Sequence, residues 1–78
     1  MCAIPTIDLA ATGRNINNMR VRANMSVRDL QAVFGFGTPQ AIYKWQQGRA
    51  MPTIDNMVIL AAVFDCTVDD ILVCTDKA

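Results

Sequence analysis

The sequence predicts a single all-α domain built from five helices. Its 78 residues are enough for one hydrophobic core, and 53% of them are apolar, which suits a folded bundle without disulfides or metal. Helix-start and helix-stop signals recur along the chain from Asp8 to Val73. We therefore expect one domain over residues 1–78, with an ordered core from about 8 to 73.

The first helix is expected to begin after Asp8 and to run to about Asn24. Asp8 is a suitable N-cap, because its carboxylate can accept a hydrogen bond from a backbone N–H of the first turn. Apolar residues recur at helical spacing and should face the core: Leu9, Ile16, Met19 and Ala23. Gly13 lies inside this segment and costs about 1 kcal/mol relative to alanine, so we expect the first turns to fray.

The second helix is expected to start at Ser26, with Asp29 completing a variant of the capping box. Its inner stripe is expected to contain Val27, Leu30, Val33 and Phe34. Gly35 should end the helix in the left-handed conformation, which only glycine adopts without steric cost. Phe36 in the following turn either plugs the junction with the third helix or lies exposed, and we expect it to plug.

The third helix is expected over residues 38–47. Thr38 and Pro39 supply a hydroxyl cap and a proline at the first helical position, and Gly48 should end the helix. Ile42 and Trp45 are three residues apart, so they share one face, which should be buried.

The fourth helix is expected to begin at Pro52 and Thr53, and the fifth at Thr67, with Asp70 at capping-box spacing and an end near Val73. The buried stripe of the fourth helix is expected to be Ile54, Met57, Leu60, Ala61 and Phe64. Residues 74–78 are expected to be frayed.

Several classes of function are poorly supported. The chain has three cysteines without CxxC spacing and no histidine, so we expect no metal site, no disulfide framework and no cofactor. The missing histidine also removes the usual general base, so we do not expect an enzyme. With no run of 18 apolar residues and no signal-like N-terminus, we expect no membrane association and a cytoplasmic location.

The charges are segregated although the net charge is zero. Residues 1–50 contain six cations and two acids, a net charge of +4, whereas residues 51–78 contain one cation and five acids, a net charge of −4. Such a distribution presents one cationic side to a polyanion.

The third helix carries the residues with the clearest chemistry. When Ile42 and Trp45 face inward, the outward stripe consists of Gln40, Tyr43, Lys44 and Gln47. Glutamine matches the N6 and N7 edge of adenine, and lysine suits the acceptors of guanine or a phosphate. Residues 38–47 contain no carboxylate. Two short helices joined by a glycine-containing turn, with this outer face on the second, are typical of a DNA-binding helix-turn-helix.

The segment from Gly13 to Val73 resembles the Cro/repressor family of helix-turn-helix proteins, which is also called lambda-repressor-like or the XRE family. The resemblance rests on the following residues: Arg20, Ser26 with Leu30, Gly35, the stretch Ile42-Tyr43-Lys44-Trp45-Gln46-Gln47-Gly48, Pro52, Leu60-Ala61, and Asp70-Ile71-Leu72. It implies a compact five-helix domain that binds double-stranded DNA and regulates transcription.

The resemblance also implies roles for individual residues. Gln40 and Lys44 fall where the family reads bases, with Tyr43 beside them. The expected phosphate contacts are Arg20, Val27, Arg28, Thr38, Gln47 and Arg49. The chain departs from the family in two places: Gly35 to Ile42 spans one residue more than usual, and Gln46 replaces the glutamate that commonly pairs with the arginine of the first helix. We therefore expect Arg20 to be freer to reach a phosphate.

Two questions about partners stay open at this stage. The apolar residues Val63, Ile71 and Val73 either close the core or form the seam of a homodimer that reads two half-sites. The protein is expected to be a repressor, and the alternative is an antitoxin or anti-repressor that uses the same scaffold to bind a protein partner.

Overall fold

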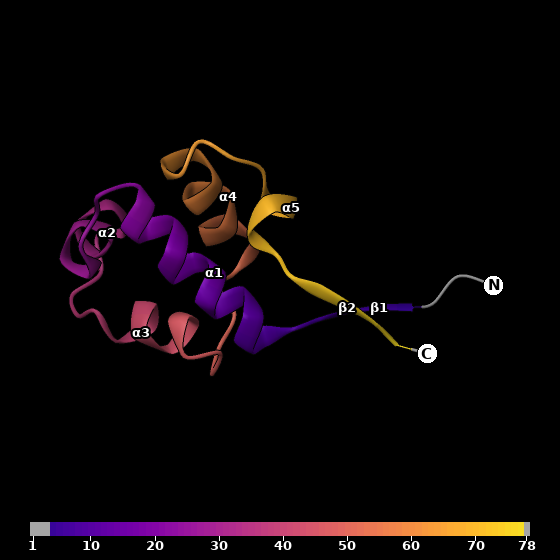
Figure 1. The fold of residues 1–78 in the computed structure, drawn as a ribbon. Helices are drawn as coiled ribbons and strands as arrows, with labels where there is room; N and C mark the ends of the chain where they lie inside the picture. The colour runs from indigo at the N-terminus through magenta and orange to yellow at the C-terminus, as the bar shows by residue number, and fades with distance from the viewer. Residues whose placement is uncertain (1–3, 78) are drawn as a thin grey trace.

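The structure, a computed structural model, describes the backbone of residues 4–77 and consists of five helices and two short strands. In chain order these are β1 (Ile4–Ile7), α1 (Leu9–Arg22), α2 (Val27–Phe34), α3 (Gln40–Gln46), α4 (Ile54–Val63), α5 (Val68–Ile71) and β2 (Cys74–Lys77) (Figure 1). The five predicted helices are all present. None of the helices within this part of the chain combines the length and apolar character that crossing a bilayer would require.

The helix ends follow the predicted capping signals in α1, α2, α4 and α5. Asp8 accepts a hydrogen bond from the backbone N–H of Ala11 at 2.9 Å, and the Thr53 hydroxyl accepts one from that of Asn56 at 3.3 Å. α2 ends at Gly35, whose φ is +70°, as the glycine predicts. These local interactions satisfy backbone donors that the helices cannot satisfy internally.

Both predicted capping boxes are formed. In α2 the Ser26 hydroxyl accepts from the N–H of Asp29 at 3.0 Å, and the Asp29 carboxylate accepts from the N–H of Ser26 at 2.8 Å. Thr67 and Asp70 make the same pair of bonds at the start of α5, at 3.2 and 3.0 Å. Because these N–H groups stabilise the charged carboxylates, the pKa values of Asp29 and Asp70 are lowered from their ordinary value of 3.8.

α1 and α3 differ from the sequence-based expectation at their starts. α1 is regular from Leu9 and does not fray around Gly13. α3 begins at Gln40, and its N-cap residue is Pro39, which makes no side-chain capping bond. The prediction that Thr38 caps this helix is therefore wrong, because the longer turn moves the first helical residue one position beyond the Thr38-Pro39 signal.

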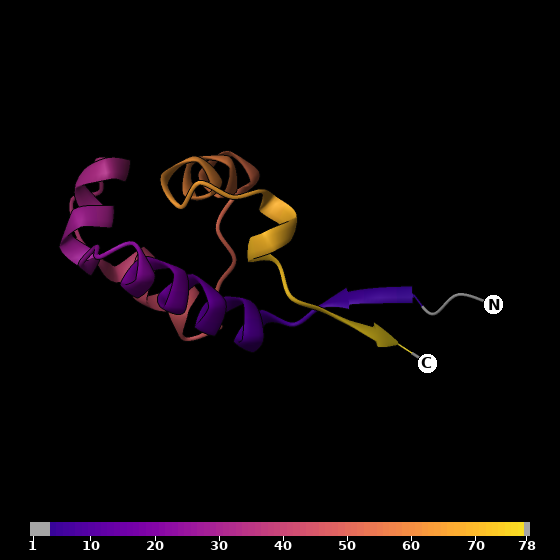
Figure 2. The same cartoon turned by 45° about the horizontal axis from the view of Figure 1, so that its top comes forward.

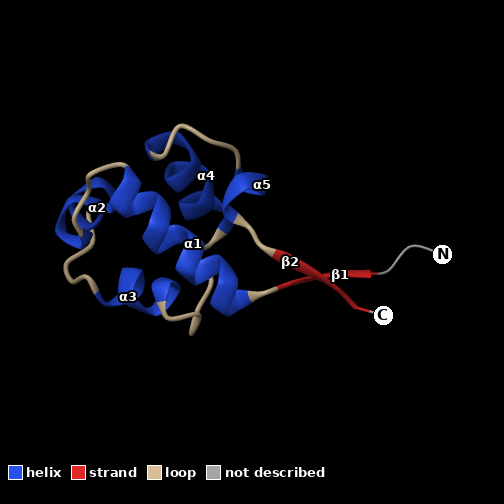
Figure 3. Ribbon diagram, viewed as in Figure 1, coloured by secondary structure: helices blue, strands red, loops and turns tan. Residues whose placement is uncertain are grey.

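The two ends of the described chain form a small antiparallel sheet, which was not predicted from the sequence. Residues 74–77, expected to be frayed, pair with residues 4–7 in the register Ile7↔Cys74 to Ile4↔Lys77, and residue 78 lies outside the described residues. The sheet projects from the helices as an arm (Figure 2 and Figure 3). The N–H of Asp8 donates to the carbonyl of Val73 at 2.8 Å and continues this pairing to the helices. The two strands meet because a hydrogen bond next to them joins α1 to the segment that follows α5. In this bond the Thr12 hydroxyl accepts from the N–H of Val73 at 3.0 Å.

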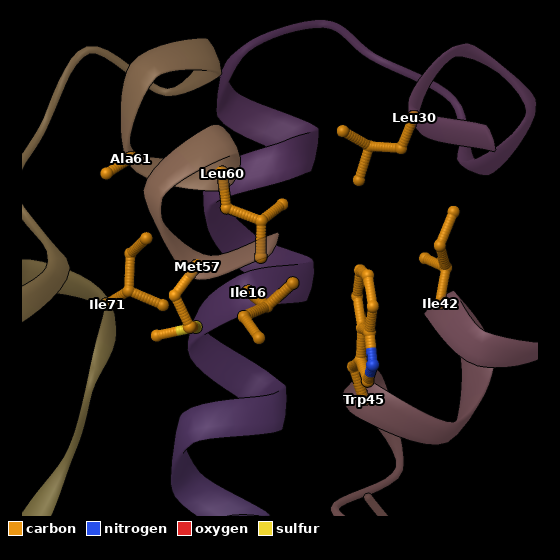
Figure 4. Packing of buried hydrophobic residues seen from close by; sticks show 8 residues of the cluster. All are labelled: Ile16, Leu30, Ile42, Trp45, Met57, Leu60, Ala61 and Ile71. Atoms are coloured by element: carbon orange, nitrogen blue, oxygen red, sulfur yellow. The ribbon is translucent and has the colours of Figure 1, made fainter. Parts of the chain in front are cut away.

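The core lies where α1 meets the other four helices. Eight apolar side chains are buried in it: Ile16, Leu30, Ile42, Trp45, Met57, Leu60, Ala61 and Ile71. Figure 4 shows Ile16 of α1 between two groups, with Leu30, Ile42 and Trp45 on one side and the residues of α4 and α5 on the other. Four residues predicted to be inside are exposed: Leu9 by 37%, Val33 by 46%, Ile54 by 77%, and Ala23.

Candidate nucleic-acid interface

The turn between α2 and α3 is held closed by backbone, amide and aromatic contacts. Gln31 contributes twice: its carbonyl accepts from the N–H of Phe36, and its side-chain amide donates to the carbonyl of Phe36, both at 3.1 Å. The Phe36 ring stacks on Phe34 with centroids 5.0 Å apart and meets Trp45 edge-on at 5.9 Å. The prediction that Phe36 plugs this junction is confirmed, and the plug fixes the start of α3 against α2.

Two glycines allow α3 to lie directly against α1. A Cβ atom added to Gly13 would overlap the carbonyl oxygen of Trp45, so the backbones of the two helices are in contact there. Gly48, just after α3, has a φ of +72°, and a Cβ on it would lie 2.7 Å from the Cα of Ala10. Both glycines are thus required by close approach, and together they fix the depth at which α3 lies on the domain.

Arg20 is held inside the domain. Its Nε donates to the amide oxygen of Gln46 at 3.0 Å, Nη1 donates to the carbonyl of Met25 at 2.7 Å, and Nη2 donates to the amide oxygen of Asn17 at 2.8 Å. The Gln46 amide thus accepts from Arg20 where the family has a glutamate, and Arg20 is not freer as expected. Because all three guanidinium nitrogens already donate within the chain, this geometry favours a positioning role for Arg20 over the expected phosphate contact.

The outward stripe of α3 is exposed as the helical spacing predicts. Gln40, Tyr43, Lys44 and Gln47 are all exposed, whereas Ile42 is fully buried and Trp45 is 4% exposed. The stripe opens onto a shallow hollow of about 290 Å³, which is lined by Pro39, Gln40, Tyr43, Lys44, Gln47 and Arg49. No carboxylate lines this hollow, so it offers hydrogen-bonding amides and two cations to a ligand.

A second and larger hollow lies between α2 and α3. Its volume is about 660 Å³, and it is lined by Val27, Arg28, Gln31, Ala32, Gly35, Phe36, Pro39 and Tyr43. Pro39 and Tyr43 line both hollows, so the two form one continuous surface on either side of the Tyr43 ring. Of the nine predicted site residues, seven lie on this surface. Thr38 is exposed in the turn outside both hollows, and Arg20 is turned inward.

Five residues of this surface were not predicted as site residues: Gln31, Ala32, Gly35, Phe36 and Pro39. Pro39 was expected as a helix-start signal that faces outward, and Gln31 was not singled out. Gln31 stabilises the turn through its two hydrogen bonds with Phe36. No local sequence pattern indicates these bonds, so only the three-dimensional structure identifies Gln31. Within the described residues no group of three or more cysteine, aspartate or glutamate side chains could hold a metal ion.

Comparison with known proteins agrees with this geometry. The model of a helix-turn-helix family matches residues 16–71. The fold is similar to that of the restriction-modification controller protein C.AhdI from Aeromonas hydrophila, with a TM-score of 0.72 and 19% identity over 82% of this chain and 96% of that one. It is also similar to the DNA-binding domain of BldD, with a TM-score of 0.70 and 15% identity over 83% of this chain and 93% of that one. Comparison with curated protein sequences finds no match.

Proposed function

Because the chain belongs to the helix-turn-helix family, in its Cro/repressor (XRE) branch of DNA-binding transcription regulators, we propose that it is a repressor that inserts α3 into the major groove. The observation that carries the proposal is the exposed stripe of α3, which is polar and free of acids and is continuous with the hollow beside α2. An α-helix fits the major groove of B-DNA, where side-chain amides and cations distinguish all four base pairs.

Gln40, Lys44 and Tyr43 are the proposed base-reading residues. The Gln40 amide would pair with the N6 and N7 edge of adenine, and the Lys44 ammonium with the O6 and N7 acceptors of guanine. Tyr43, 45% exposed between the two hollows, would place its ring against a thymine methyl group. Each good contact of this kind contributes about 1–3 kcal/mol of discrimination.

The remaining surface residues would bind the DNA backbone. Arg28 and the N–H of Val27 lie at the start of α2, where the helix dipole favours an anion. Gln47 and Arg49 lie at the other end of the stripe, and Thr38 lies in the turn. Phosphate contacts at these places would fix the orientation of α3, while the stripe reads the sequence.

We also propose that the protein acts as a homodimer in the cytoplasm and represses by occupying a promoter. A domain of this size contacts few base pairs, and two copies related by a two-fold axis would read two half-sites. Of the three residues expected at the seam, Ile71 is fully buried in the core, so it is unavailable for a second copy. Val63 and Val73 are half-buried.

The test is selection of a preferred duplex from random DNA, followed by a salt-dependent binding titration. We expect a selected sequence to bind far more tightly than random DNA, with an affinity that falls steeply as salt rises. Lys44→Ala should lower specific affinity about 10- to 100-fold, with Arg14→Ala, which removes an exposed cation of α1, as the matched control. Equal, weak binding to every duplex would overturn the proposal.

A further inference from the structure

The outer face of α4 is apolar and uncovered. Eight of its ten residues are apolar, and only Met57, Leu60 and Ala61 are buried in the core. The apolar residues left outside are Ile54, 77% exposed, Val58, 57% exposed, Ile59, 37% exposed, and Ala62. Ile54, Val58 and Ala62 are four residues apart and form one continuous stripe, which we call the α4 stripe. A contiguous apolar stripe on the outer face of a helix often marks a contact with another surface.

The charges around the α4 stripe exclude nucleic acid and anionic lipid as its partner. The nearest charged residues in the sequence are Asp55 and Asp65, and residues 51–78 carry a net charge of −4. Phosphate groups would be repelled by these acids, and helices that lie on membranes carry cations beside their apolar face. An apolar protein surface is the remaining kind of partner.

The size pattern along the stripe fits a second copy of the same chain. If two α4 helices pack antiparallel about a two-fold axis through Val58, Ile54 of one copy lies opposite Ala62 of the other. The largest exposed side chain of the stripe thus meets its smallest one at both ends of the contact. A two-fold interface requires this self-complementarity.

We infer that the α4 stripe is the surface through which two copies of this chain associate. The inference rests on the proposed function, because it names the contact of the proposed homodimer. The stripe contributes three side chains per copy, whereas a standard stable interface involves about 20–30 residues on each side. The free protein therefore associates weakly, and two copies on adjacent half-sites associate readily because their effective concentration is high.

The decisive experiment measures self-association without DNA. Val58→Asp places a charge at the centre of the stripe, and Val21→Asp on α1 is a matched control, because both valines are helical and 57% exposed. In sedimentation equilibrium up to millimolar protein, we expect weak dimerisation of the unmodified chain and of Val21→Asp, and at least a 10-fold weaker association of Val58→Asp. A strictly monomeric chain, or equal association of the two variants, would overturn the inference.

A cross-linking measurement provides a second readout that does not require a destabilising charge. The axis through Val58 predicts that Val58→Cys forms a disulfide between copies under mild oxidation, whereas Val21→Cys does not, both in a background with the native cysteines changed to serine. Equal cross-linking of the two variants would count against the α4 contact.

The DNA experiments separate this inference from the proposed function. On a duplex with one half-site, Val58→Asp and Val21→Asp should bind alike. On a duplex with two half-sites, only Val58→Asp should lose cooperative binding. Loss of sequence preference in every variant would overturn the repressor proposal, while the sedimentation result would still decide the α4 contact.

Discussion

α3 and α4 have similar inner faces and opposite outer faces. Each buries two or three apolar residues against α1 and its neighbours, α3 through Ile42 and Trp45 and α4 through Met57, Leu60 and Ala61. Outside, α3 presents amides, a phenol and an ammonium group, whereas α4 presents isoleucine, valine and alanine. The inner faces specify the fold, and the difference between the outer faces underlies the two proposed partners, DNA for α3 and a second copy of the chain for α4.

The two helices are also held by different means. α3 lies so close to α1 that Gly13 and Gly48 contact backbone atoms of the neighbouring segment, and Arg20 bridges to Gln46. α4 is held by the burial of its side chains, and Met57 and Leu60 are almost fully buried. A helix that must insert into a groove benefits from such backbone contact, because its position then depends little on side-chain rotation.

The largest expected effect comes from breaking this close contact of α3. Gly13→Ala places a Cβ against the carbonyl oxygens of Trp45 and Gln46, which are backbone atoms that cannot rotate away. We expect a loss of about 3 kcal/mol of unfolding free energy, measured by urea denaturation, because overpacking forces α3 from its place. Helix propensity alone would change stability in the opposite direction, by about 1 kcal/mol in favour of alanine.

Gly37→Ala is the matched control for Gly13→Ala. Gly37 has open space around the position of a Cβ and no positive φ, so we expect a change of at most about 0.5 kcal/mol. A stabilising effect of Gly13→Ala would contradict the close backbone contact between α1 and α3.

The next largest effect concerns Arg20. Arg20→Lys keeps the charge but loses the planar set of donors that reaches Gln46, Met25 and Asn17, so we expect a loss of roughly 1–2 kcal/mol of stability.

The salt dependence of DNA binding distinguishes a positioning role of Arg20 from a phosphate contact. A positioning role leaves the slope of log affinity against log salt unchanged in Arg20→Ala, whereas a phosphate contact lowers it by about one. Arg28→Ala, on the proposed interface, should lower this slope.

The sequence predicted well at most places where the deciding interaction is local, the Thr38 cap being an exception. Both capping boxes, the left-handed Gly35 and the inward pair Ile42 and Trp45 depend on residues three or four apart, and all were predicted. The outward stripe of α3 follows from that pair, since a helix with a known buried side has a known exposed side. The surface formed by seven of the nine predicted site residues was therefore accessible to sequence reasoning.

Most of the other errors occur where distant segments meet. Gly13 was interpreted as a weakness of α1, because its contact with Trp45 spans more than 30 positions and leaves no local pattern. Ile54 was placed in the core because apolar residues surround α4 on all sides, so periodicity could not distinguish the inner stripe from the outer one. The pairing of β1 with β2 joins opposite ends of the chain and has no turn signal between them.

A smaller effect tests the departure of Gln46 from the family's glutamate. Gln46→Glu would place a carboxylate on the Arg20 guanidinium and make their hydrogen bond charge-assisted, with a gain of about 0.5–1 kcal/mol in urea denaturation and no change in DNA affinity. Gln47→Glu is the matched control, because Gln47 directly follows Gln46 and lies on the exposed stripe of α3. It should leave stability nearly unchanged and weaken DNA binding at low salt. The reverse pattern would mean that Gln46, not Gln47, faces the DNA.

The smallest effect compares the two capping boxes, one in the basic part of the chain and one in the acidic part. The folded-state pKa values of Asp29 and Asp70 are lowered by the N–H groups of Ser26 and Thr67. The stability that each carboxylate adds is therefore complete above its unfolded pKa and is lost as the pH falls through the lower, folded value. Asp29→Asn and Asp70→Asn should each be less stable than the unmodified chain at pH 7, and the difference should shrink in urea denaturation near pH 3. A difference that is the same at both pH values would contradict this origin.

DNA binding at pH 7 should separate the two variants. Asp29→Asn removes an acid from α2 and should strengthen binding, whereas Asp70→Asn, on α5, should leave it unchanged.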